Sequence, residues 1–143
     1  MSALCFIVLA VVVVDQAIKL MLRRLLGTDA LLLGRYGSLR VVKARIALRQ
    51  IGYQCSASTI WCIWSAAAAA LVLASTLAPL SALYVGLLLG SSFSHAAEST
   101  LRGSITDYIC LRNRVFNLAD LALLAGVLGI AAELLMIVQQ RAL

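Results

Sequence analysis

Charged residues are scarce in this chain. They make up 13% of its 143 residues, whereas hydrophobic residues make up 63%. Water-soluble domains carry about 25% charged and about 45–50% apolar residues, so this composition excludes an ordinary soluble domain and predicts a membrane protein. A single proline, few acidic residues and the lack of long polar tracts also exclude a disordered or linker-dominated chain.

The cysteines supply no metal or redox motif. The four of them form no CxxC pair, and the single histidine does not stand at ligand spacing from them, so we expect no metal and no cofactor. The net charge of +6 does not point to nucleic acid, because the basic residues lie mostly between apolar runs. Anionic phospholipid headgroups are the expected partners of these cations.

Four apolar segments are long enough to cross a bilayer, which takes about 20 residues of helix. They run from about Ala3 to Leu22, Thr59 to Leu77, Ser81 to Gly103 and Asn117 to Val138. A cleaved signal peptide is the alternative for the first segment, but no basic region precedes it and no small-residue cleavage site follows it. We therefore predict an all-α membrane protein, with one four-helix transmembrane domain over residues 1–143 and both termini on the same side.

A basic segment, residues 23–58, separates the first two of these helices. From Val42 to Arg49, apolar residues alternate with mostly cationic ones, which is the period of a strand with one apolar and one cationic face. We predict a small β-rich extramembrane insert that rests on the membrane surface, with its cationic face toward the headgroups. A basic loop without strands is the alternative.

The polar residues gather on one side of the membrane. In a four-span chain, that side receives the end of the first helix, the insert, the end of the third helix and the start of the fourth. Ionisable residues at membrane depth are costly, and they mark functional sites by default. The candidates are Asp15, Lys19, Gln50, Gly52, His95, Glu98, Arg102, Asp107 and Asp120.

Asp107 and Asp120 are candidates for a catalytic dyad. Two carboxyls that share a proton have pKa values pushed apart, so that one acts as base and the other as acid. We expect them to lie close together because a short loop joins two antiparallel helices between them. A structural alternative exists for Asp120, since Asn117 can cap the fourth helix and place Asp120 at the third helical position, where the helix dipole favours it.

Other candidates have structural alternatives as well. Asp15 and Lys19 are four residues apart on a helix and can neutralise each other as an ion pair. His95 and Glu98 share a helical face and can hydrogen-bond within a polar core.

Three short motifs stand in order on the first, third and fourth helices. They are DQAIK at Asp15–Lys19, RGSITDY at Arg102–Tyr108 and FNLAD at Phe116–Asp120. Together they resemble lipoprotein signal peptidase, the type II bacterial signal peptidase, over most of the chain. The resemblance implies an intramembrane aspartyl endopeptidase that removes the signal peptide of a prolipoprotein before its diacylglyceryl-modified cysteine. It also implies the bacterial cytoplasmic (inner) membrane, with cytoplasmic termini and the active site toward the outer face, and we expect a monomer.

The resemblance assigns roles residue by residue. It implies that Asp107 and Asp120 are the catalytic aspartates and that Asn117 supports Asp120. For Asp15 and Lys19 it implies a structural or supporting role without a catalytic step. The insert would be a small sheet that cradles the substrate.

The end of the third helix departs from the family pattern. Where the family usually has GNxxDR, this chain has His95, Glu98 and Ser99 at the Asn, Asp and Arg positions, so the arginine is missing. Arg102 stands one helical turn further on and is a candidate to take its place.

The insert departs from the pattern too. An NxGAAF-like motif is expected there, and QIGYQC, which begins at Gln50, keeps only its glycine, Gly52. An active peptidase with altered substrate preference is the first interpretation. The alternatives are an inactive paralogue that binds lipidated peptides and a small transporter with buried acids.

The distribution of positive charge conflicts with this orientation. The insert and the last loop are basic, whereas near the termini only Arg141 supports a cytoplasmic position. Applied literally, the positive-inside rule would place the insert and the two aspartates in the cytoplasm. We follow the motifs, because they are more specific than a charge count.

Overall fold

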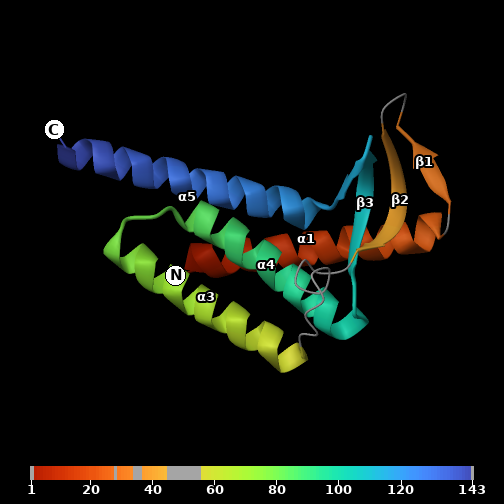
Figure 1. The fold of residues 1–143 in the computed structure, drawn as a ribbon, viewed down its shortest axis with the longest axis horizontal. Coiled ribbons are helices and arrows are strands. Elements are labelled where there is room, and N and C mark those ends of the chain that lie inside the picture. The colour runs from red at the N-terminus through yellow and green to blue at the C-terminus, as the bar shows by residue number, and fades with distance from the viewer. Residues whose placement is uncertain (1, 28, 34–36, 45–55, 143) are drawn as a thin grey trace.

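Four long helices and a four-stranded sheet make up most of the computed structural model, which describes residues 2–27, 29–33, 37–44 and 56–142 (Figure 1). The elements follow one another as α1 (Ser2–Leu26), β1 (Ala30–Leu32), β2 (Gly37–Ala44), α3 (Ala57–Leu77), α4 (Ala82–Arg102), β3 (Ile105–Leu111), β4 (Arg114–Phe116) and α5 (Leu118–Ala142).

Three of the described helices, α1, α3 and α5, are long and apolar enough to cross a membrane. The chain is therefore a multi-pass membrane protein. Helix α4 is as long as α3 but carries several serines, His95 and Glu98. It packs against α1, α3 and α5, so its polar side chains face protein where a lipid-facing helix would need apolar ones. That α4 is a fourth span stays a prediction.

Local sequence explains where α4 begins and ends. Pro79 disfavours a helical conformation in the residue before it and separates α3 from α4. Ser81 then caps α4 by accepting a hydrogen bond from the Leu83 N–H at 3.2 Å. At the other end, Gly103 has a φ of 71°, a left-handed conformation that favours glycine after a helix. Both ends agree with the boundaries predicted from the sequence.

Glycines let α4 approach its neighbours closely. A Cβ atom at Gly90 would lie 2.9 Å from the side chain of Val11 on α1, and one at Gly126 on α5 would lie 2.9 Å from the backbone of α4. Larger residues at these positions would force the helices apart. The close packing brings the polar side chains of α4 against those of α1 and against the start of α5.

The sheet lies at the end of the helices opposite to the chain termini (Figure 1). Its strands are antiparallel in the order β1-β2-β3-β4. Strands β1 and β2 confirm the small β-rich segment between the first two helices. The exposed residues of β2 are its two cations, Arg40 and Lys43, whose spacing of three reflects a register shift between Leu39 and Val42. Residues 45–55, with Gln50 and Gly52, lie outside the described residues.

The connection between α4 and α5 is a β-hairpin, so the prediction of a short loop there was wrong. Strands β3 and β4 fill it, and β3 pairs with β2 from Ala44↔Ile105 to Gly37↔Leu111. Thus half of the sheet lies outside the insert, and the chain is mostly helical with a small sheet. The strands of the hairpin were missed because the partner of β3 stands before α3 in the sequence, where local periodicity cannot reveal it.

Candidate functional site

Asn117, the residue before α5, joins Asp107 on β3 to Asp120 on α5. Its Nδ2 donates a hydrogen bond to Asp107 Oδ1 at 2.6 Å, and its Oδ1 accepts one from the Asp120 N–H at 3.0 Å. Its own backbone N–H donates to Asp120 Oδ2 at 2.8 Å. The Asn117 side chain is fully buried. Asn117 therefore contacts both carboxylates, that of Asp107 through its side-chain amide and that of Asp120 through its backbone N–H.

The reciprocal bonds between Asn117 and Asp120 form a capping box at the start of α5. The structural role predicted for these two residues is thus present. It is compatible with a chemical role, because the box uses Asp120 Oδ2 and leaves Oδ1 facing His95, 3.5 Å away. The Asp120 side chain is 39% exposed, so this oxygen belongs to the more accessible of the two carboxylates.

The first turn of α5 is also tied to β3 and to α1. The Leu118 N–H donates to the hydroxyl of Tyr108 at 3.0 Å, and the Ala119 N–H donates to Asp15 Oδ1 at 3.3 Å. These two bonds, with that of the Asp120 N–H, satisfy the donors that a helix start leaves open. The position of Asp120 is thereby fixed relative to Asp107.

The two carboxyls lie in different environments. Burial raises the pKa of Asp107, which is 9% exposed, and the charge of Asp120 raises it further, while the hydrogen bond from Asn117 acts in the opposite direction. A buried carboxyl with a raised pKa beside a more exposed carboxyl is an arrangement suited to acid–base chemistry by two carboxyls.

A network of buried charges lies beside this pair. Lys19 Nζ is 2.7 Å from Asp15 Oδ2 and 2.8 Å from Glu98 Oε2, and Arg23 binds both Glu98 and the hydroxyl of Thr106. Asp15 and Lys19 form the ion pair that their spacing predicts. Each carboxylate faces a cation, which is what the burial of charge demands. Because Asp15 holds the start of α5 and Thr106 precedes Asp107, the network orients the two catalytic candidates.

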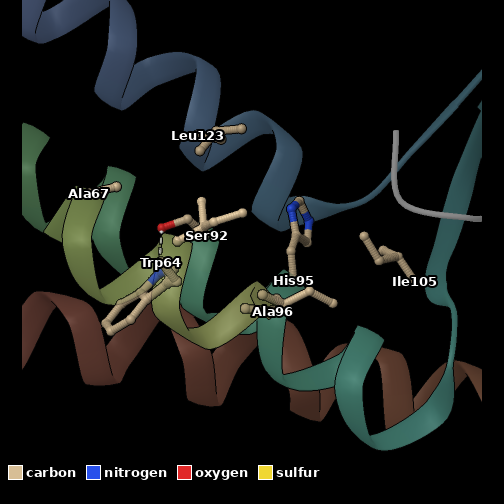
Figure 2. Close-up of a pocket in the computed structure, with 9 residues that line it drawn as sticks. Trp64, Ala67, Ser92, His95, Ala96, Ile105 and Leu123 are labelled. Atoms are coloured by element: carbon tan, nitrogen blue, oxygen red, sulfur yellow. Dashed lines mark hydrogen bonds between the residues drawn. The ribbon is translucent and has the colours of Figure 1, made fainter. Parts of the chain in front are cut away.

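An open apolar cavity of about 300 Å³ adjoins the site between α3, α4, α5 and β3. Its lining includes Ile60, Trp64, Ile105 and Leu123, and its ionisable side chain is that of His95. In Figure 2 the ring of His95 points from α4 toward the start of α5, and Trp64 is held by a hydrogen bond to Ser92. The site therefore joins two carboxylates to a surface suited to an apolar chain.

Comparison with known proteins assigns the chain to a family. The model of signal peptidase (SPase) II matches residues 7–136. The chain belongs to this family. Membership supports a lipoprotein signal peptidase function in general, with a prolipoprotein as the kind of substrate.

Two solved structures share the fold, and each is described as a bacterial membrane enzyme determined by the in meso method, at 1.9 and 2.3 Å resolution. The first has a TM-score of 0.79 and 20% sequence identity, with 94% of each chain covered. The second has a TM-score of 0.76 and 19% identity and covers 95% of this chain and 89% of the other. No curated protein matches the chain.

An arginine that the sequence analysis did not single out, Arg23, contacts Glu98 near the position where the signal peptidase II pattern has its arginine. Arg102, the predicted replacement, is exposed at the last residue of α4, whereas Arg23 reaches Glu98 from α1. The signal was present, because Asp15, Lys19 and Arg23 follow one another at intervals of four and so share one face of a helix.

The structure divides the other candidates of this signal peptidase II chain into two groups. His95 lies with Asn117 and the two aspartates, whereas Glu98 turns to the buried cations. Their roles in a reaction remain predictions.

Proposed function

We propose that the chain is an intramembrane aspartyl endopeptidase that removes the signal peptide of diacylglyceryl-modified prolipoproteins by cutting before the lipidated cysteine. Membership of the signal peptidase II family supports the general activity. The observation that carries the rest is the bridge by which Asn117 holds Asp107 and Asp120. An asparagine that only capped a helix would have no need to bind the carboxylate of a neighbouring strand.

Asp107 and Asp120 are the proposed catalytic residues, and they act on one water molecule. One carboxylate takes a proton from the water as its oxygen bonds to the scissile carbonyl carbon, while the other carboxyl gives its proton to the carbonyl oxygen. When the intermediate collapses, the C–N bond breaks, the amine nitrogen takes the proton held by the first carboxyl, and the intermediate's hydroxyl returns a proton to the second. The products are a carboxylic acid and an amine, and both carboxyls regain their starting states.

The proposed topology has four spans, with α4 the central one and the termini in the cytoplasm. It places the sheet end of the helices at the outer face of the bacterial cytoplasmic membrane, where a translocated precursor presents its lipidated cysteine. The exposed Arg40 and Lys43 of β2 would then meet anionic phospholipid headgroups. The protein would act as a monomer.

The buried ion pairs weigh against the transport alternative. Asp15 and Glu98 are the acids that a proton relay through the helices would use, and both are held by cations within the described part of the chain. Both acids are thus already occupied by structural ion pairs. An inactive peptide-binding paralogue is the remaining alternative, and the following experiment separates it from a peptidase.

The test is processing of a purified diacylglyceryl prolipoprotein by wild type, Asp107→Asn, Asp120→Asn and the double variant. We expect each single change to abolish processing nearly as completely as the double change, because the two carboxyls act as one unit. Ser75→Ala is the control, since Ser75 bonds only to its own helix among the described residues. Because the pKa of Asp107 is raised, the acid form should persist above the usual range, and activity should fall as the pH rises through that pKa. Binding without cleavage by wild type would support the paralogue instead.

A further inference from the structure

His95 reaches the bridge between the two carboxylates from α4. Its Nε2 lies 3.3 Å from Asn117 Oδ1 and 3.5 Å from Asp120 Oδ1. The Asn117 oxygen is an acceptor only, and its orientation is set because the amide nitrogen of the same side chain donates to Asp107. The contact is therefore favourable only when Nε2 carries a hydrogen.

The Asp120 oxygen near His95 is the one that the helix cap does not use. Oδ2 accepts from the Asn117 N–H, so Oδ1 is left to face the site. A hydrogen bond from an imidazole N–H to an ionised oxygen is charge-assisted. Asp107 lies on the other side of Asn117 and is more buried, and burial raises its pKa.

The apolar cavity lies beside this contact. Ile105 and Leu123 line the space beside the His95 ring, which Figure 2 shows turned toward the start of α5. Hydrogen bonds are electrostatically stronger where the surroundings are apolar. A substrate chain lying in this cavity would exclude water from the same contact.

We propose that His95 is a positioning residue for the reaction, whose Nε2–H holds the Asp120 carboxylate aimed at the water, so that Asp120 is the base and Asp107 the acid. The inference rests on the proposed peptidase function and assigns each carboxyl its part in it. The proton of the water goes to Asp120, and the proton of Asp107 goes to the carbonyl oxygen. His95 keeps its own hydrogen throughout, so it neither gives nor takes a proton.

The kinetic test compares His95→Ala and His95→Gln with wild type. Without the donor, kcat should fall about 10- to 100-fold, as expected for a hydrogen bond to a charged group, while KM changes by less than about 3-fold. Glutamine keeps an N–H donor and should restore kcat to within about 5-fold of wild type. Thr100→Val is the matched control on α4, because the Thr100 hydroxyl bonds to carbonyls of its own helix. Equal losses in the alanine and glutamine variants, or an effect on KM alone, would overturn the proposal.

A spectroscopic test works without activity. The chain has one histidine, so labelling with ¹⁵N-histidine gives the imidazole spectrum of His95 alone, provided that the purification tag contains no histidine. The neutral ring should carry its hydrogen on Nε2, and that resonance should shift in Asp120→Asn but not in Thr100→Val. A ring protonated on Nδ1, or an Nε2 resonance unchanged by Asp120→Asn, would refute the role of His95 even if wild type cleaves. The expected spectrum in a wild type that does not cleave would refute the peptidase function instead.

Discussion

Replacing Asn117 by serine or alanine separates the two functions of its side chain. Serine caps helices about as well as asparagine, and its hydroxyl can accept the Asp120 N–H. It is too short to reach Asp107, so the 2.6 Å bond to that carboxyl is lost. Alanine loses both the cap and the bridge. The two variants therefore differ in the helix cap and share the loss of the bridge.

The magnitudes follow from these bonds. A hydrogen bond to a charged group contributes about 1.5–3 kcal/mol, and each 1.36 kcal/mol is tenfold in rate, so loss of the bridge should lower kcat/KM about 10- to 150-fold in both variants. Loss of a cap costs about 1 kcal/mol, so Asn117→Ala should be less stable than Asn117→Ser by about that amount. Both variants should therefore lose activity to a similar extent, because both lack the hydrogen bond to Asp107. Only the alanine variant should also lose stability, because only it lacks the helix cap.

Two measurements on the same detergent-solubilised samples decide the matter. Cleavage of a diacylglyceryl prolipoprotein gives kcat/KM, and denaturant unfolding gives the free energy of unfolding. If Asn117→Ser cleaved with the kcat/KM of wild type, the hydrogen bond from Asn117 would not be what positions Asp107. Activity losses that simply parallel the losses of stability would refute this role of the bond equally, because Asn117 would then matter only through folding.

Two further predictions concern the buried charges and the orientation. Lys19→Ala removes the cation between Asp15 and Glu98 and should lower the free energy of unfolding, measured with denaturant, by about 3–5 kcal/mol. A decrease below about 1 kcal/mol would mean that Arg23 alone compensates the charge of both acids. Asn113 and Ser2 are both exposed, so each can carry a cysteine label in a variant without the four native cysteines. A membrane-impermeant thiol reagent should label Asn113→Cys in intact spheroplasts but Ser2→Cys only after lysis. The reverse pattern would place the carboxylates on the cytoplasmic side and exclude the proposed function.

The helices were predictable from the sequence because their signals are local. The helices coincide with long apolar runs, and Pro79 and Gly103 mark boundaries between them. The spacing of Asn117 and Asp120 predicts the start of α5. The pairing of Asp15 with Lys19 was predictable for the same reason, since both stand on one helix face. Each of these features depends on residues within a few positions of one another.

The remaining features depend on contacts between distant segments. Strand β3 is not predictable from local sequence, because it acquires its hydrogen bonds from β2, on the far side of α3 and α4 in the sequence. The role of Asn117 as a bridge required the position of Asp107 on that strand. Likewise, the contact of Arg23 with Glu98 depends on how closely α1 packs against α4, which the spacing of residues along either helix does not reveal.

The pairing of β2 with β3 has a consequence for the biogenesis of the protein. Strand β2 leaves the ribosome before α3 and α4 are made, and β3 appears only after both helices have been synthesised. Asp107 arrives with β3, and Asn117 and Asp120 follow only with the start of α5. A nascent chain that ends with α4 therefore contains the cations Lys19 and Arg23 but neither carboxylate of the pair. The two carboxylates can therefore come together only after the start of α5 has been translated.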